Sequence, residues 1–243
     1  MSTQMTFAEN LQHLRSAANL SPEQMARLLS VSPSEWSSWE SGSAHPDPAS
    51  LVRISDTLHI PLDRLLRHDL RQIAELRAKR DQIKLFLLDI DGTLTNGGMM
   101  YSESGDQIKQ FNVKDGMAIY RLIKRGGKEF GFISSGNTIE IMKTRAKTLG
   151  IQRVYAGKRP KVEVIDEWLA EMGATYEELA YVGDDLNDLP AIQKAGMSAC
   201  PADACWQVRA AVDLVLTKGG GQGCVREFLE EVLGYDIHEL RQK

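Results

Sequence analysis

Cysteine is scarce in this chain of 243 residues, and the three cysteines present, Cys200, Cys205 and Cys224, follow no CxxC spacing. They predict neither a disulfide framework nor a zinc site, and they favour a reducing, cytoplasmic compartment. No run approaches the ~20 apolar residues that span a bilayer. The N-terminus has neither the basic segment nor the apolar core of a signal peptide. The expectation is a soluble protein with no membrane partner.

A surplus of positive charge is also missing, since 29 basic and 33 acidic residues give a net charge of −4. This balance argues against a protein that holds nucleic acid by bulk electrostatics. Hydrophobic residues make up 42% and charged residues 26% of the chain, which is typical of a globular protein and argues against disorder. The length fits one large domain or two smaller ones.

Lysine is absent from residues 1–68, where helix-start signals recur. Residues 21–24 (SPEQ) and 32–35 (SPSE) each offer an N-cap serine, a proline at the first helical position and Gln or Glu two residues after that proline. They predict two short helices that begin at Pro22 and Pro33, and Pro48 and Leu62 begin two more. A first domain over 1–68 is therefore all-helical. The charged segment 69–84, with Leu70, Ile73 and Leu76 on one stripe, predicts a helical linker.

Beyond residue 84 apolar strands alternate with amphipathic helices, which predicts a second domain over 85–243. The predicted strands are 84–90, 129–134, 152–155, 179–183, 197–200 and 213–216. The predicted helices are 115–126, 138–149, 160–172, 186–195, 203–211 and 223–233. Alternation of this kind is typical of α/β folds with a mostly parallel sheet covered on both faces.

The strand over 84–90 ends in two carboxylates, Asp89 and Asp91, followed by Gly92. Residues two apart in a strand share a face, and the glycine allows a sharp turn after them. Ligands of open α/β sheets bind outside the carboxyl ends of the strands, so both acids are candidates for chemistry. The alternative is a strand end with two solvated acids.

Polar side chains also follow the later strands. Ser134 ends the strand at 129–134 and Ser135 follows it, and Lys161 opens a helix after the next strand. Three more carboxylates, Asp184, Asp185 and Asp188, follow the strand at 179–183. Such a dense acidic cluster is costly without a cation, and its hard oxygen ligands favour Mg²⁺.

This set of motifs, DIDGT at 89–93, Ser135, Lys161 and GDDLND at 183–188, resembles the haloacid dehalogenase (HAD) superfamily. Within it, FNVKDGMAI at 111–119 and GGGQGCVREFLEEVL at 219–233 look like the capless branch of 3-deoxy-D-manno-octulosonate 8-phosphate (KDO 8-phosphate) phosphatases. The resemblance implies a Rossmann-like phosphatase domain that hydrolyses a sugar-acid phosphate.

The same resemblance implies roles for individual residues. Asp89 is expected to attack phosphorus and Asp91 to act as acid and base, while Ser135 and Lys161 hold the phosphoryl oxygens. Mg²⁺ is expected on the Asp89 carboxylate, the Asp91 carbonyl and Asp184, with support from Asp185. Asp188 is expected to orient Lys161 or a metal-bound water. Ser134 and Lys158 are interpreted as exposed loop residues.

Capless members have only a short hairpin after the first motif, and they close the site with a neighbouring subunit, commonly as tetramers. Residues 98–113 fit such a hairpin, with a turn at 104–106. Its Met99, Met100 and Tyr101 are candidates for a subunit interface in a homotetramer, or else for the core.

One position departs from the branch, which usually has Thr-Gly-Arg where this chain has Ser135-Gly136-Asn137. Loss of the arginine removes a bidentate partner for an anionic sugar acid. A nine-carbon sugar-acid 9-phosphate or a less acidic sugar phosphate is therefore an alternative to KDO 8-phosphate. Arg226 is a candidate to supply the missing charge.

Residues 7–68 resemble the Cro/CI-type helix-turn-helix family, through a pattern that includes Gln24, Ala26, Val31, Trp39 and Gly42. The resemblance implies a recognition helix at 33–40, with Gln24 on phosphate and Ser34, Glu35 and Ser38 towards bases. Trp36 either fills the core or lies exposed at a contact.

The charge of this domain disagrees with DNA binding, because five arginines and seven acids give 1–68 a net charge of −2. The interpretation is a Mg²⁺-dependent phosphatase with a small all-α helix-turn-helix domain, through which DNA is a possible partner. A transcriptional regulator that senses a sugar phosphate and an interaction scaffold are the alternatives.

Overall fold

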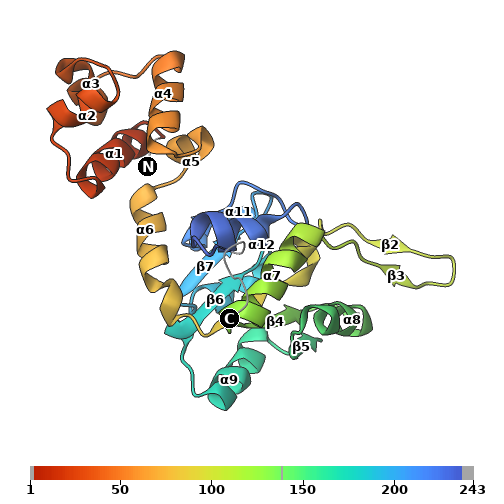
Figure 1. Ribbon diagram of the computed structural model, residues 1–243. Coiled ribbons are helices and arrows are strands. Elements are labelled where there is room, and N and C mark those ends of the chain that lie inside the picture. Colours follow the sequence, from red (N-terminus) through yellow and green to blue (C-terminus); the bar gives the residue numbers. More distant parts are fainter. Residues whose placement is uncertain (1–2, 138, 237–243) are drawn as a thin grey trace. The chain divides into compact units, whose positions relative to one another are not determined.

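The computed structural model describes residues 3–137 and 139–236, and the chain folds as two compact units, Met1–Glu75 and Leu76–Lys243 (Figure 1). The division falls within the predicted linker 69–84, which forms helix α6 (Leu70–Lys79) followed by a short turn. Among the described residues, none of the helices combines the length and the apolar character needed to cross a membrane.

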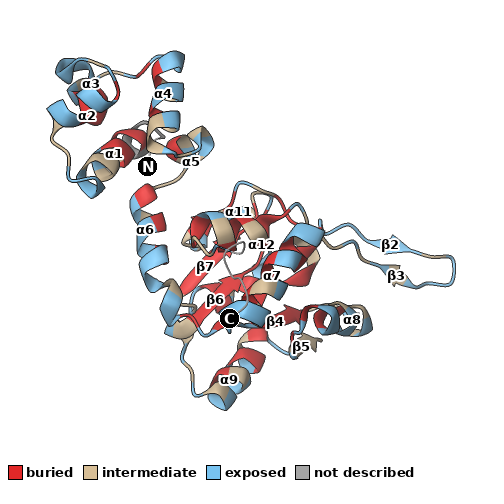
Figure 2. Cartoon of the chain, in the orientation of Figure 1, coloured by how far each residue is buried: buried red, intermediate tan, exposed pale blue. Residues whose placement is uncertain are grey.

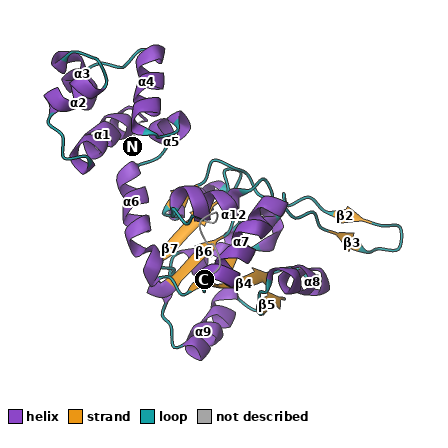
Figure 3. Cartoon of the chain, viewed as in Figure 1, coloured by secondary structure: helices purple, strands orange, loops and turns teal. Residues whose placement is uncertain are grey.

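The first unit is helical, as Figure 3 shows by colour. Both SPxE/Q signals form the predicted capping boxes, in which the serine hydroxyl and the Gln24 or Glu35 side chain exchange hydrogen bonds with backbone N–H groups. The helices are α1 (Thr3–Ala17), α2 (Pro22–Leu28), α3 (Pro33–Glu40), α4 (Pro48–Leu58) and α5 (Leu62–Arg67).

Helix α3 has buried positions (Figure 2), and its two tryptophans belong to the core of this unit. Trp36 is fully buried and meets Trp39 edge to face, with ring centroids 6.4 Å apart. Of the two alternatives for Trp36, the structure shows the core position. Met25 and Leu29 of the α2 region are also buried, so the helix-turn-helix packs on its own apolar side chains.

The second unit is built on a six-stranded sheet in the order β5-β4-β1-β6-β7-β8, and every neighbouring pair is parallel. The mostly parallel α/β fold expected from the sequence is therefore confirmed. The strands are β1 (Leu85–Leu88), β4 (Glu129–Ser134), β5 (Arg153–Ala156), β6 (Leu179–Val182), β7 (Met197–Cys200) and β8 (Leu214–Val215).

Helices cover both faces of the sheet, and the side chains of β1 point alternately to one face and the other. Leu85 and Leu87 belong to a core formed with α9, α10 and α11. Phe86 instead stacks on Phe130 at 5.0 Å and meets Tyr235 edge to face. The helices are α7 (Val113–Gly126), α8 (Ile139–Leu149), α9 (Lys161–Met172), α10 (Leu189–Ile192), α11 (Trp206–Ala211) and α12 (Cys224–Arg226).

Three predicted helices differ from the structure. The helix expected over 186–195 is a 3₁₀ turn at Leu186–Asp188 followed by the short α10, since the Asp188 carboxylate folds back onto the backbone. The helix expected over 203–211 begins only at Trp206. Residues 224–232 start as α12 and continue as a wider π-helical stretch, Glu227–Val232. Thr138, where another helix was expected to begin, lies outside the described residues.

The predicted hairpin forms between β1 and α7. Its strands β2 (Met100–Tyr101) and β3 (Gln107–Ile108) are antiparallel, with Met100 opposite Ile108. Met99, Met100 and Tyr101 are all about half exposed or more, which excludes the core alternative within this chain.

The strand order itself indicates where a ligand binds. From β1 the chain runs outward to β4 and β5 on one side, and to β6, β7 and β8 on the other. This reversal makes the carboxyl ends of β1 and β6 the crevice in which doubly wound folds bind their ligands. Asp89 and Asp184 follow these two strands.

Candidate active site

The turn after β1 brings two carboxylates together. Asp89 follows β1 directly, and its N–H donates to the carbonyl of Val182 on β6 at 2.9 Å. Gly92 then adopts φ +102°, and a Cβ atom at this position would lie 2.0 Å from Asp184 Oδ2. Only glycine allows the turn to pass this close to Asp184. Thr93 completes the contact, because its hydroxyl donates to Asp184 Oδ1 at 3.0 Å.

Asp188 organises the end of β6 although it lies in the following turn. Its side chain is fully buried, and its Oδ2 accepts the N–H groups of Asp184 and Asp185 at 3.0 and 3.1 Å. Its Oδ1 accepts the hydroxyl of Tyr181 at 2.6 Å. The carboxylate thus fixes the backbone that carries Asp184.

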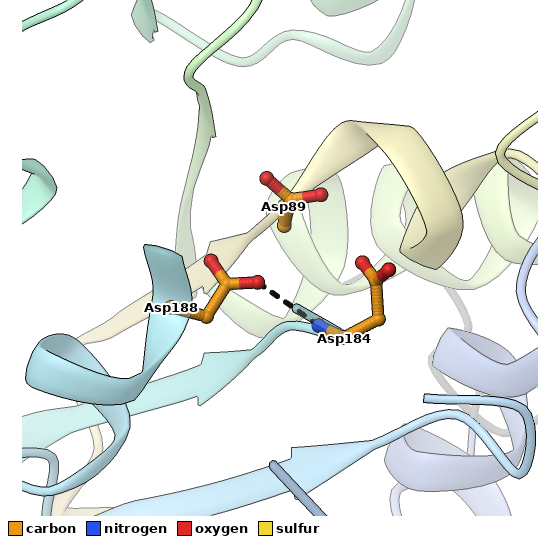
Figure 4. Close-up of side chains that lie close together, drawn as sticks. All are labelled: Asp89, Asp184 and Asp188. Atoms are coloured by element: carbon orange, nitrogen blue, oxygen red, sulfur yellow. Dashed lines mark hydrogen bonds between the residues drawn. The ribbon is translucent and has the colours of Figure 1, made fainter. Parts of the chain in front are cut away.

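Lys161 bridges an acid that follows β1, Asp89, and an acid in the turn after β6, Asp188. Its ammonium lies 2.5 Å from Asp89 Oδ1 and 2.5 Å from Asp188 Oδ1, and all three side chains are at most 6% exposed. Carboxylate oxygens of Asp89, Asp184 and Asp188 lie within 4.8 Å of one another, and Figure 4 shows the three side chains converging. This is a compact group of hard oxygen ligands around one buried ammonium.

The charges of this group are out of balance. Burial raises the pKa of Asp89 well above its usual range, against the opposing effect of Lys161. Burial and the Asp188 carboxylate raise the pKa of Asp184 to about 7. Burial lowers the pKa of Lys161, but the charges of Asp89 and Asp188 outweigh it, so that pKa rises. Three carboxylates against one ammonium leave a deficit of positive charge, which a divalent cation would fill.

Asp91 lies apart from this cluster and has different partners. Lys109, which follows β3, forms an ion pair with Asp91 Oδ1. Ser134, at the end of β4, lies with its hydroxyl 3.3 Å from Asp91 Oδ2. Ser134 is 2% exposed, so its interpretation as an exposed loop residue is wrong: strand β4 extends through it and turns its side chain inward.

The other predicted residues occupy the rim. Ser135 is half-buried, and its hydroxyl accepts from Asn187 Nδ2 at 2.9 Å, which ties the end of β4 to the turn after β6. Lys158 is exposed, as expected. Asp185 is exposed too, and its carboxylate accepts the N–H of Leu186 as a helix cap, so it is not among the clustered acids of the described residues.

A glycine-rich loop, 219–223, closes over the turn after β1. The N–H of Gly221 donates to the Thr93 carbonyl at 2.9 Å, and a Cβ atom on Gly220 would lie 1.8 Å from the Gly92 carbonyl oxygen. Asn112 Nδ2 donates to the Gly221 carbonyl at 2.9 Å. The loop therefore holds the turn and the start of α7 together.

Two positions, Asn137 and Arg226, were considered from the sequence in connection with the negative charge of a sugar-acid substrate. Asn137 is exposed. The Arg226 guanidinium forms an ion pair with Glu230 on its own helical segment. The backbone N–H of Arg226 donates to the buried Asp115 carboxylate at 2.8 Å. Its guanidinium is thus already neutralised within the described part of the chain.

Sequence reasoning missed Lys109, Tyr181 and Asn187. Tyr181 carried a signal, since it is a hydroxyl in an apolar strand that leads into the acidic cluster. Asn187 lies inside the GDDLND motif, but its contact with Ser135 joins residues 52 apart. Lys109 lies among the polar residues of a hairpin, and nothing in the local pattern distinguishes it.

In the first unit, the polar residues expected to face DNA serve the helix ends. Gln24 accepts the N–H of Ser21 at 2.7 Å, and Glu35 accepts the N–H of Ser32 at 2.8 Å. Hydrogen bonds from Ser32 lower the pKa of Glu35, which keeps this exposed group negative. Helix α3, which was expected to face DNA, has no basic residue.

Comparison with known proteins gives two family matches. Residues 6–68 match a helix-turn-helix domain family, and residues 112–196 match the haloacid dehalogenase-like hydrolase family. The chain is 37% identical over 158 residues to the 3-deoxy-D-manno-octulosonate 8-phosphate phosphatase KdsC of Haemophilus influenzae, which covers 65% of this chain and 87% of that protein.

Solved structures give the same picture. A probable YrbI family phosphatase from Pseudomonas syringae pv. phaseolica has 40% identity and a TM-score of 0.63, over 66% of this chain and 90% of that chain. The 3-deoxy-D-manno-octulosonate 8-phosphate phosphatase from Moraxella catarrhalis, solved with a magnesium ion, a phosphate ion and KDO, has 36% identity and a TM-score of 0.62. The match covers 65% of this chain and 90% of the Moraxella chain.

Proposed function

Because the chain belongs to the haloacid dehalogenase-like hydrolases, in the branch of the KDO 8-phosphate phosphatases, and is therefore a phosphatase, we propose that it hydrolyses a sugar-acid phosphate with Mg²⁺ through an aspartyl-phosphate intermediate. The observation that carries the proposal is the buried group at the ends of β1 and β6. There Asp89 is held by Lys161, and Asp184 and Asp188 lie within 4.8 Å.

The first step is attack by Asp89 on phosphorus. An oxygen of its carboxylate forms a bond to phosphorus while the bond from phosphorus to the sugar oxygen breaks. Asp91 gives its proton to that departing oxygen and becomes a carboxylate. Lys161 and the Ser135 hydroxyl hold oxygens of the transferred group, and the contact of Ser135 with Asn187 fixes the hydroxyl for this role.

The second step releases phosphate. Asp91, now ionised, takes a proton from a water molecule whose oxygen attacks phosphorus, and the bond between phosphorus and Asp89 breaks. Asp91 thereby regains the proton it lost, and Asp89 returns to its carboxylate form. The two acids need different surroundings for these roles, and they have them: Asp89 is buried, whereas the Asp91 side chain is 40% exposed.

The residues present fit a magnesium ion. The carboxylates of Asp89 and Asp184 and the backbone carbonyl of Asp91 would hold it. The excess negative charge of the buried carboxylates favours a divalent cation. When bound, the ion supplies charge that offsets the repulsion between the carboxylates and the phosphate. Asp188 is committed to Lys161, Tyr181 and two backbone N–H groups, which suits a residue that orients Lys161.

The substrate class follows from the relatives, whose printed names specify KDO 8-phosphate. The exposed Asn137 provides no cation for the carboxylate of a sugar acid, so we include nine-carbon sugar-acid 9-phosphates as candidates. The exposed apolar side chains of the hairpin fit contact with a neighbouring copy, and we propose a homotetramer.

The test is phosphate release from a panel of sugar phosphates with and without Mg²⁺, in the full chain and in Asp89→Asn. The panel includes KDO 8-phosphate and nine-carbon sugar-acid 9-phosphates. We expect Mg²⁺-dependent turnover that Asp89→Asn abolishes, because asparagine is not a competent nucleophile for this step. A wild-type chain that is folded and inactive on the whole panel would refute the proposal.

A second candidate function is sequence-specific DNA binding by the first unit, supported by its match to a helix-turn-helix family. In that case the phosphatase unit would sense a sugar phosphate. The acidic recognition helix weighs against it. Selection from a randomised duplex library with the full chain tests it, and enrichment of one sequence motif that persists at physiological salt would establish it.

A further inference from the structure

We propose that Lys109 is a positioning residue that fixes the carboxylate of Asp91 for its proton transfers. The inference rests on the proposed function, since it assumes that Asp91 acts as the acid and base. It concerns a lysine that lies outside the four motifs and belongs to the hairpin segment.

The ion pair between these two residues is unusually sheltered for a hairpin. The Lys109 side chain is only 9% exposed, whereas most of its neighbours in the hairpin face solvent. Its ammonium contacts Asp91 Oδ1, 18 residues away along the chain. A lysine that only solubilised the hairpin would instead extend into water.

The two oxygens of Asp91 are held from opposite elements. Lys109 reaches Oδ1 from the segment after β3, and the hydroxyl of Ser134 lies 3.3 Å from Oδ2 at the end of β4. Asn112 anchors the Lys109 segment to the glycine-rich loop, through its hydrogen bond to the Gly221 carbonyl. The base of the hairpin is therefore fixed, and it holds Lys109 at a defined place.

This arrangement assigns different tasks to the two oxygens. An ammonium can only donate hydrogen bonds, so Lys109 occupies Oδ1. Oδ2, which accepts the Ser134 hydroxyl through one lone pair, is the oxygen that carries the proton that moves to the departing sugar oxygen. In the second step the same Oδ2 takes the proton from water. Lys109 exchanges no proton itself; it restricts rotation of the carboxylate about its Cβ–Cγ bond, which keeps the reacting oxygen oriented.

The test is a double-variant cycle of Lys109→Met and Asp91→Asn, measured on the best sugar phosphate of the panel. A positioned acid and base contributes about 10²–10⁴-fold, so we expect Lys109→Met to lower kcat by about 10- to 100-fold with KM within about threefold. In the Asp91→Asn background the same change should cost less than about twofold, because the group that Lys109 positions is already inactive. Lys109→Arg, which keeps the charge, should recover most of the loss.

Lys84→Met is the matched control, because Lys84 forms an exposed ion pair with Glu178 beside the opposite end of β1. It should retain wild-type turnover. Equal losses from Lys109→Met in both backgrounds, or a rise in KM at constant kcat, would overturn the inference in favour of a structural or a substrate-binding role. If Lys109→Met does not fold, Lys109→Gln provides the same comparison. An inactive wild type would refute the proposed function and this inference together, whereas active wild type with equally active Lys109→Met refutes only the inference.

Discussion

Replacing Lys161 with methionine should strongly destabilise the Leu76–Lys243 unit, because the change removes the only cation that contacts Asp89 and Asp188 among the described residues. The three side chains are 2%, 6% and 0% exposed, so water cannot solvate the remaining carboxylates. Methionine has a similar volume and leaves no large cavity, so the effect reports charge rather than packing.

The magnitude follows from the burial of the group. Removing one partner of a buried ion pair costs about 3–5 kcal/mol, since an uncompensated charge remains inside. For a unit of this size about 1 kcal/mol lowers the melting temperature by about 2–4 °C, so we expect a decrease of about 6–20 °C. Lys84→Met, which breaks only an exposed pair, should change the melting temperature by less than about 2 °C.

The pH dependence of this loss has a definite sign. Burial raises the pKa of Asp89, and removal of the ammonium raises it further. An acid whose pKa is higher in the folded than in the unfolded state takes up a proton on folding. This proton uptake stabilises the folded state at low pH, and the stabilisation is lost as the pH rises through the folded-state pKa. The loss of stability caused by Lys161→Met should therefore be smaller at about pH 5 than at about pH 8.

Differential scanning calorimetry of the full chain in EDTA measures the effect, at both pH values and again with Mg²⁺. The added ion should raise the melting temperature of Lys161→Met by more than that of the wild type, because the variant has the larger charge deficit. A melting temperature within about 2 °C of wild type in EDTA would refute the reasoning, since it would mean that the carboxylates do not depend on Lys161.

Gly92→Ala should reduce turnover by about 100-fold or more, because its Cβ would lie 2.0 Å from Asp184 Oδ2 in a backbone conformation that favours glycine; misplacement of a reacting group by ~1 Å is enough for such a loss. Phosphate release at saturating Mg²⁺ measures it, and near-normal turnover would contradict the assigned role of the turn. Trp36→Ala should destabilise the first unit by about 3–5 kcal/mol, because the side chain is fully buried, while the turnover of the second unit is unchanged. Calorimetry combined with the same activity assay tests this, and equal loss of both would show that the units do not fold separately.

The sheet could be predicted because its strands are short and largely apolar, and β1 and β6 are continuous apolar runs. Residues 129–134 and 197–200 are bounded by charged or glycine-rich segments, and β4 and β7 match them. The structure of residues 186–195 could not be predicted, because it depends on the Asp188 carboxylate, which accepts two backbone N–H groups of the preceding turn. Helical periodicity contains no information about such a contact.

Within the site, the sequence identifies residue types but not their pairing. Ser134 and Ser135 are equivalent in composition, and only the end of β4 decides that Ser134 turns towards Asp91 while Ser135 meets Asn187. A strand that ended one residue earlier would exchange their surroundings. The contact between Lys109 and Asp91 depends on where the hairpin returns to the sheet, which no local pattern records.

The charges of the buried group also explain why our proposal needs a metal ion as well as Lys161. Asp89 and Asp188, each 2.5 Å from the ammonium, take up two of its three N–H donors and most of its charge, which leaves one donor for a phosphoryl oxygen. A phosphate group that approaches Asp89 therefore meets carboxylates whose charge is only partly compensated, and like charges about 4 Å apart repel by about 4 kcal/mol in a partly buried site. A divalent cation held by the Asp89 and Asp184 carboxylates would offset that repulsion. Substrate binding should consequently require the ion. The Tyr181 hydroxyl and the backbone N–H groups of Asp184 and Asp185 hold the Asp188 carboxylate, which keeps Lys161 in place when the phosphate arrives.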